Sequence, residues 1–194
     1  MKTLINRLLL IVLAAAGITA ASCAKSQQDD STSEGEQKKT LVAYFSATGT
    51  TEKIAGRLAN VTGGDLYAIM PEKPYSDADL DWRNEQSRST LEMHDATARP
   101  AIGALPADMA DYDVVFIGYP IWWDEAPRVI NTFIESCDLS GKTVIPFATS
   151  GGSSITNSEK ELKGSYPALN WKEGRLLNFA DEEEISSWTD DFGY

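Results

Sequence analysis

The sequence predicts an α/β domain built around a parallel sheet, and three observations support this fold class. Short apolar runs alternate with helix-period segments through residues 40–194, which is the order typical of α/β proteins. Three runs are almost unbroken, as expected of strands that helices cover on both faces: 41–45, 114–117 and 144–148. Glycine-containing polar loops follow the first and the last of these runs, where turns are needed.

The remaining elements follow from the spacing of apolar side chains. Residues 65–70 and 171–177 predict two less buried strands, which brings the count to five. Pro127 suits the first turn of the helix after the third strand, and the acids at 181–183 favour the start of a C-terminal helix. The predicted helix faces are Ile54, Ala55, Leu58 and Val61, then Val129, Ile130, Phe133 and Ile134, then Ile185, Trp188 and Phe192.

Length and charge limit the classes of protein that fit. The chain has 194 residues, of which 42% are hydrophobic and 24% charged, so one domain with a hydrophobic core is expected. Its 29 Asp and Glu residues outnumber its 17 Lys and Arg residues, which gives a formal net charge of −12. Because nucleic acids are bound mainly by neutralising their phosphates, this acidic surplus disfavours a nucleic-acid-binding function.

The first 39 residues predict export and anchoring rather than folding. Residues 1–22 combine two basic residues, a short apolar stretch and small residues, the pattern of a secretory signal peptide. Cys23 follows Ala-Ala-Ser, an order similar to the lipobox of bacterial lipoproteins, whose cysteine is acylated; ordinary cleavage nearby is the alternative. Residues 25–39 contain no hydrophobic side chain and are expected to form a solvated tether. The sequence thus predicts a signal peptide (1–22), a lipidated cysteine with a disordered tether (23–39), and a folded domain (40–194) in the cell envelope.

Neither Cys137 nor His94 is predicted to take part in chemistry. Lipidation of Cys23 leaves Cys137 as a single thiol, and its position continues the apolar spacing of a helix, so we expect it in the core. His94 is the only histidine and lies in a polar stretch, so we expect it at the surface, away from the loops that follow the strands. The sequence contains no cluster of metal-ligating residues, so no metal site is predicted.

The loop at residues 46–51 is a candidate phosphate site. It follows the first strand and opens the first helix, where backbone amides and the helix dipole attract anions. Gly49 lets the backbone approach a ligand closely, and hydroxyl groups can donate to phosphate without adding a cation. A capped turn with no ligand is the alternative, since Ser and Thr also favour helix N-termini. The hydroxyl donors are Ser46, Thr48, Thr50 and Thr51.

Two further loops are expected at the same edge of the sheet, because all carboxyl ends of parallel strands meet there. Residues 119–124 (YPIWWD) contain Trp122 and Trp123, which cannot both point inward, so one should be exposed or cover a ligand. Residues 149–154 (TSGGSS) offer a close backbone and several donors to the polar edge of a planar ring. The alternative for residues 119–124 is a tryptophan packed under its own loop. The alternative for residues 149–154 is a plain flexible turn.

These three loops, taken in order, resemble those of the flavodoxin family, in particular its secreted and lipoprotein bacterial branch. The similarity extends over residues 40–194 and includes 87–102. It implies a flavodoxin-like three-layer sandwich with a five-stranded parallel sheet in the order 2-1-3-4-5 and FMN at its carboxyl edge. It further implies that Ser46, Thr48, Gly49, Thr50 and Thr51 hold the phosphate, that Pro120, Ile121, Trp122 and Trp123 flank the isoalloxazine ring, and that Ser150, Gly151 and Gly152 lie at its other side.

Asp124 departs from this pattern, because a small residue, often glycine, is expected after the paired tryptophans. It places a charge near the expected flavin, or else its carboxylate or that of Glu125 favours the N-terminus of the next helix. Ser46 and Tyr119 stand where a response regulator would need acidic residues, which excludes that use of the architecture.

The expected function is electron transfer by an envelope-anchored FMN protein with an unidentified redox partner. An FMN-dependent reductase of a quinone or nicotinamide is one alternative, and a binding module that has lost FMN is another.

Overall fold

The computed structural model describes residues 38–194, so the expected signal peptide, Cys23 and nearly all of the tether lie outside the described residues. Within this part no helix is both long and apolar enough to cross a membrane. The strands β1 (Thr40–Tyr44), β2 (Asp65–Ala68), β3 (Val114–Pro120) and β4 (Thr143–Thr149) form one parallel sheet.

The order of the sheet is β2-β1-β3-β4-β5, which confirms the predicted parallel topology. The prediction of one continuous fifth strand at 171–177 is wrong, because two short strands, β5 (Asn170–Trp171) and β6 (Arg175–Leu176), pair separately with β4. Gly174 lies in the interruption, where an added Cβ would come within 2.6 Å of the Pro146 carbonyl oxygen. The chain therefore approaches β4 closely at a point that admits only glycine.

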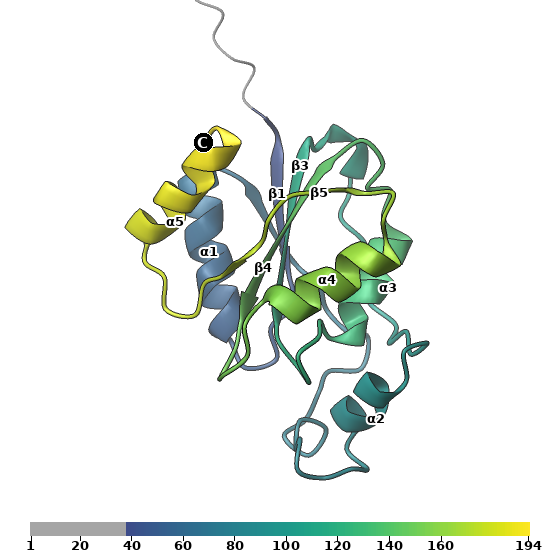
Figure 1. Cartoon of the computed structure of the whole chain (residues 1–194). Coiled ribbons are helices and arrows are strands. Elements are labelled where there is room, and N and C mark those ends of the chain that lie inside the picture. Colours follow the sequence, from purple (N-terminus) through teal and green to yellow (C-terminus); the bar gives the residue numbers. More distant parts are fainter. Residues whose placement is uncertain (1–37) are drawn as a thin grey trace, which may run out of the picture. The chain divides into compact units, whose positions relative to one another are not determined.

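Helices cover both faces of the sheet and complete three layers (Figure 1). On one face, α1 (Thr50–Thr62) and α5 (Glu182–Thr189) pack against one apolar cluster. On the other face, α3 (Arg128–Ser136) and α4 (Thr156–Ser165) pack against a second cluster. All three predicted helix faces contribute to these clusters, and Cys137 packs at the margin of the second. Burial raises the pKa of its thiol to about 11.

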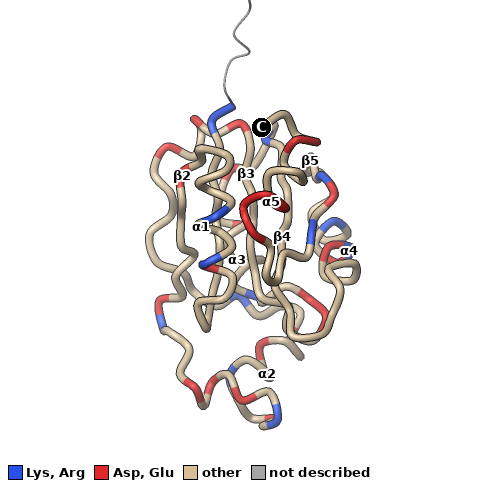
Figure 2. The backbone as a smooth tube through the Cα atoms, turned by 90° about the vertical axis from the view of Figure 1, so that its left-hand side faces the viewer, with Lys and Arg blue, Asp and Glu red and all other residues tan. Residues whose placement is uncertain are grey.

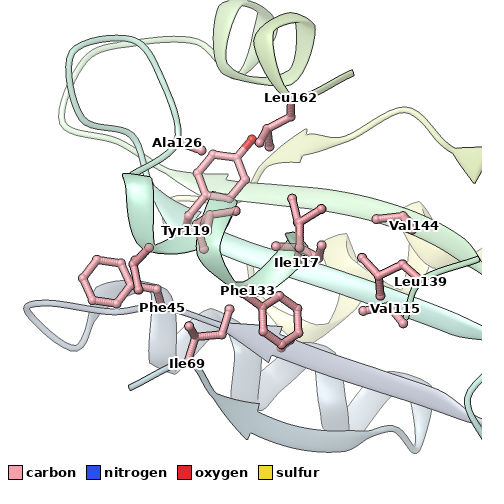
Figure 3. Packing of buried hydrophobic residues seen from close by; sticks show 14 of the residues in the cluster. Phe45, Ile69, Val115, Ile117, Tyr119, Ala126, Phe133, Leu139, Val144 and Leu162 are labelled. Atoms are coloured by element: carbon pink, nitrogen blue, oxygen red, sulfur yellow. The ribbon is translucent and has the colours of Figure 1, made fainter. Parts of the chain in front are cut away.

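The second cluster extends to the carboxyl edge of the sheet (Figure 3). Phe45 and Tyr119 lie there, and both are almost completely buried. Tyr119 turns its hydroxyl toward α4, where it lies 3.2 Å from the Ser158 hydroxyl. This contact gives the buried phenol a polar partner, so the end of β3, just before the loop that contains Trp122 and Trp123, is fixed in place.

The long connection between β2 and β3 first passes beyond the carboxyl edge of the sheet, where α2 lies, and then returns to the opposite edge, where β3 begins (Figure 1). It contains α2 (Arg88–His94) and a short 3-10 helix at Met109–Asp111. Ser87 caps α2 by accepting from the Thr90 amide, and an antiparallel bridge joins Pro71 to Ile102. The bridge brings Pro71 and Ile102 together, so residues 72–101 project as one loop over the carboxyl edge.

Charge is unevenly placed on the described residues (Figure 2). Four consecutive acids, 181–184, begin α5, and Asp181 and Glu184 form a reciprocal capping box there. A 3-10 turn at Asp190–Phe192 follows α5. The α2 connection carries charges of both signs (Figure 2).

Candidate cofactor-binding site

A cavity of about 610 Å³ opens at the carboxyl edge of the sheet, where the three predicted loops meet. This volume falls in the range typical of small-molecule sites, about 300–1,000 Å³. Six of the predicted site residues line it: Thr48, Pro120, Ile121, Trp122, Trp123 and Gly151. The others, Ser46, Gly49, Thr50, Thr51, Ser150 and Gly152, lie beside these in the same three loops.

The first loop presents a helix N-terminus at the cavity. Gly49 precedes α1 with φ of +83°, a left-handed conformation that glycine adopts without strain. No side chain of the described residues caps this helix end, so its first amides are free to bind an anion. Thr48 and Thr50 are exposed, with their hydroxyl oxygens 3.5 Å apart. These groups form a set of neutral donors at one end of the cavity.

Thr51 differs from the other threonines of this loop. Its side chain is buried, and its hydroxyl lies 2.8 Å from the hydroxyl of Thr149 at the end of β4. Since one of the two must donate to the other, the pair joins the first and third loops beneath the cavity surface. The structure thus gives Thr51 a structural partner that the sequence did not predict, and its role as a phosphate ligand stays a prediction.

The tryptophan loop makes a tight turn. The amides of Trp122 and Glu125 each donate to the other residue's carbonyl oxygen, at 3.0 and 2.9 Å. The two residues between them, Trp123 and Asp124, have φ of +49° and +62°. Positive φ at both central positions is the signature of a type I′ turn, which usually contains Asn or Gly. The glycine expected in place of Asp124 matches this conformation, so the aspartate keeps the turn at some cost in backbone strain.

The two tryptophans have different surroundings. Trp122 is partly buried and packs edge-on against Phe45 and Tyr75, with ring centroids 5.6 and 5.3 Å apart. Trp123 is 39% exposed. Trp122 therefore belongs to a fixed cluster of three aromatic rings with Phe45 and Tyr75, here called the aromatic floor, whereas Trp123 lies at the exposed opening of the cavity.

A network around Tyr75 holds this aromatic floor in place. The Tyr75 hydroxyl donates to the Glu92 carboxylate, and Arg88 pairs with that carboxylate at 2.6 Å while its guanidinium lies 4.0 Å from the Tyr75 ring centroid. Burial, followed by the bond to Glu92, raises the pKa of Tyr75 well above its usual value. The phenol thus stays protonated and keeps donating, which anchors α2 to the ring beneath Trp122.

Asp124 and Glu125 do not cap α3, which begins after Pro127 without a side-chain cap. Asp124 instead accepts a hydrogen bond from the Ser153 hydroxyl, and its carbonyl accepts from Asn157 at 3.2 Å. Glu125 pairs with Arg128 at 2.8 Å. No hydrogen bond therefore supports the interpretation that the carboxylate of Asp124 or Glu125 stabilises the N-terminus of α3.

The third loop is held by its own serine. The Ser150 hydroxyl accepts from the amides of Gly152 and Ser153 at 3.1 and 2.8 Å, and the Ser150 amide donates to Asn178. Gly151 and Gly152 are exposed, and a Cβ added to either would meet no atom within 4 Å. Nothing in the described protein itself demands glycine at these positions, and the bare backbone leaves room for a ligand there.

The sequence missed the wall that the α2 connection contributes. Leu80, Trp82 and Ser89 line the cavity together with the three loops. No hydrophobic periodicity marked them, because Leu80 and Trp82 lie in turns and α2, which contains Ser89, has only seven residues. The available signal was Trp82 itself, a large aromatic residue within the charged stretch DLDWRNEQ.

The expectation that His94 lies away from the loops is wrong. His94 ends α2 and is exposed, but its ring lies 6.3 Å from the Trp123 ring, measured between centroids. The folding of the α2 connection over the sheet edge brings it there. No group of three metal-ligating side chains occurs in the described residues.

Comparisons with known proteins place the chain in a family. It is 62% identical to a candidate flavoprotein from Bacteroides eggerthii, with a TM-score of 0.79 over 81% of this chain and 99% of that one. A candidate flavoprotein from Bacteroides uniformis is 55% identical, with a TM-score of 0.77 over 80% and 99%. A Lactobacillus acidophilus flavoprotein in complex with FMN shares the fold at 22% identity, with a TM-score of 0.61 over 78% and 99%.

No curated protein matches the chain. The family model described as flavodoxin matches residues 39–192, which is nearly the whole described part. With the sheet order, the three loops and the cavity at their meeting point, this match establishes that the chain belongs to the flavodoxin family.

Proposed function

We propose that the domain holds FMN noncovalently in this cavity and passes electrons between partner proteins at the bacterial cell envelope. The main support is that the three loops meet around one cavity, whose lining includes Thr48, just before the uncapped N-terminus of α1, and the two tryptophans of the second loop. FMN supplies the redox chemistry when bound, and the protein binds, orients and shields it.

The phosphate end of the site fits an anion despite the acidic net charge. The first-turn amides of α1 and the hydroxyls of Thr48 and Thr50 are donors that bring no positive charge of their own. One group opposes binding, since the Glu52 carboxylate lies beside Gly49 in the first turn of α1. The site therefore binds phosphate through dipoles in the presence of one nearby like charge.

The ring end fits a planar, largely apolar group. Ile121, Trp122 and Trp123 offer an apolar wall, and Gly151, followed by the equally exposed Gly152, adds bare backbone to the lining. Backbone amides and carbonyls there can meet the polar edge of an isoalloxazine ring. Since Phe45 and Tyr75 brace Trp122, this wall is set before the cofactor arrives, which lowers the entropic cost of binding.

Electron transfer is supported by the absence of a placed acid or base in the lining of the cavity. The described residues that line it are apolar, hydroxyl-bearing or glycine, with no ionisable side chain among them. A group that moved protons to a substrate would have to be contributed from outside this lining. An FMN-dependent reductase is the second candidate function. Unlike a carrier, it needs space for a substrate to stack on the flavin ring.

The experiment compares the two roles directly. The purified chain is loaded with FMN, reduced chemically without oxygen, and mixed either with oxidised carrier proteins or with soluble quinone and NAD(P)⁺. A carrier gives fast oxidation of its flavin by the protein acceptors, and slow oxidation by the small molecules at a rate that does not saturate. An oxidation rate that is fast and saturates with the concentration of quinone or NAD(P)⁺ would replace the carrier role with the reductase.

Anchoring at the envelope is supported by the order Ala-Ala-Ser-Cys and by the apolar-free segment at 25–39. Cells producing the wild-type chain and the Cys23→Ala variant are fed a labelled fatty acid, and their membrane and soluble fractions are compared. We expect label and membrane association only in the wild type. Label on both chains, or on neither, would reject acylation at Cys23.

A further inference from the structure

The α2 connection contributes one large residue to the cavity to which no role has been given. Trp82 lines the cavity, yet its side chain is 67% exposed. The guanidinium carbon of Arg83 lies 5.1 Å from its ring centroid. When a flat ring covers an indole so exposed, apolar surface of both rings leaves water, which favours their contact.

Trp82 stands on a turn that is tied to α2. The Asp79 carboxylate accepts from both the amide and the hydroxyl of Ser76, at 2.9 and 2.7 Å, and the Ser89 amide donates to the Asp79 carbonyl at 3.0 Å. Ser89 also lines the cavity. The backbone just before Trp82 is therefore tied to α2 beside the cavity, and the indole lines the cavity with most of its surface exposed.

The other walls of the cavity are built differently. Trp122 is fixed by its packing on Phe45 and Tyr75, and Gly151 offers only backbone. A planar ring that lay on the tryptophan loop would thus have a fixed aromatic contact from the loop after β3 and none from the loop after β4. Trp82 is the lining residue of the connection that can supply a second aromatic contact.

We propose that Trp82 covers the outer face of the bound flavin, so that the ring lies between the α2 connection and the tryptophan loop. The inference rests on the proposed FMN site and names the residue that closes it. While the indole covers that face, a second planar molecule cannot stack there. Electrons then leave through the exposed edge of the ring, which deepens the assignment as a carrier.

The test uses flavin binding and fluorescence rather than activity. Dissociation constants of FMN and riboflavin are measured for the full chain, for Trp82→Leu and Trp82→Phe, and for Phe179→Leu. Phe179 is the matched control, because it is 90% exposed and does not line the cavity. Thermal unfolding without flavin checks that each variant is folded.

Loss of one aromatic side chain that stacks on a nucleic-acid base weakens binding by about 1–3 kcal/mol, so Trp82→Leu should weaken the binding of both flavins by about 5-fold to 160-fold. The emission of the bound flavin should rise, because the stacked indole no longer quenches it. Trp82→Phe should restore most of the affinity, and Phe179→Leu should match the wild type.

Two results would overturn the inference in distinguishable ways. Wild-type affinity and quenching in a folded Trp82→Leu variant would show that the indole does not cover the flavin, and would leave the proposed function intact. Failure of the wild-type chain to bind either flavin would refute the proposed function, and the inference with it.

Discussion

The carboxylate of Asp124 accepts a hydrogen bond from the hydroxyl of Ser153, and this contact joins the loop after β3 to the loop after β4. Both loops bound the same cavity. Asp124 occupies a left-handed turn position where glycine would be less strained, so the aspartate gains a cross-link and a charge in exchange for backbone strain. The charge and the cross-link can be separated by substitution.

Asp124→Asn removes the charge and keeps an oxygen that can accept from Ser153, and Asn also tolerates the left-handed conformation. The reduction potential of the bound flavin should rise, because an anionic reduced flavin is no longer repelled. Added salt should reduce the difference in reduction potential between the variant and the wild type, because Asp124 is exposed and its charge is screened. Spectroelectrochemical titration measures the shift, and Ser153→Ala is the control that keeps the charge. Equal potentials in wild type and Asp124→Asn would reject electrostatic tuning.

Replacing Thr48 and Thr50 together with alanine tests the phosphate end. Each hydrogen bond from a neutral donor to a charged acceptor contributes about 1.5–3 kcal/mol, so FMN should bind far more weakly. Riboflavin lacks the phosphate, and its affinity should change little. Calorimetry with both ligands makes the comparison, and an equal loss for the two would place these threonines elsewhere than on the phosphate.

Thr51→Val should act on stability. The variant leaves the Thr149 hydroxyl buried without its partner at 2.8 Å, which costs about 1–3 kcal/mol. Urea unfolding without flavin should show a lower midpoint with an unchanged slope, and Thr51→Ser should recover most of the loss. An unchanged midpoint, together with weaker FMN binding, would return Thr51 to the phosphate site as the sequence predicted.

Glu52→Gln should tighten FMN binding. The substitution removes the carboxylate beside Gly49, so the phosphate meets less repulsion, while riboflavin binding should stay the same. Added salt should reduce the difference in FMN affinity between the variant and the wild type, because it screens the Glu52 charge. The fold should lose a few tenths of a kcal/mol, because an acid in the first turn favours the helix dipole. Weaker FMN binding in the variant would show that Glu52 does not face the phosphate.

Much of the sheet could be predicted because its strands are apolar on both faces and its helices are apolar on one. β1, β3 and β4 lie where the unbroken runs predicted strands. The fifth strand was misjudged, because its interruption depends on the approach of Gly174 to Pro146, which lies far away in the sequence. Local patterns carry no information on such a contact.

The residues of the site likewise fall into those that local patterns predict and those that depend on distant contacts. Residues in turns directly after strands could be placed at one edge, because parallel topology requires it. The positions of Trp82 and His94 beside the cavity could not be predicted. The conformation of the α2 connection depends on an ion pair, a buried phenol and helix caps rather than on a periodic pattern of hydrophobic residues. The partner of Thr51 was likewise invisible, since Thr149 follows it by 98 residues.

Equilibrium titration of the purified, flavin-free chain with FMN shows whether this cavity binds the cofactor. We expect one FMN to bind per chain, with a shifted visible spectrum, quenched flavin emission and tighter binding than riboflavin. Unchanged flavin absorbance and emission, at protein concentrations where the folded chain is in excess, would contradict it.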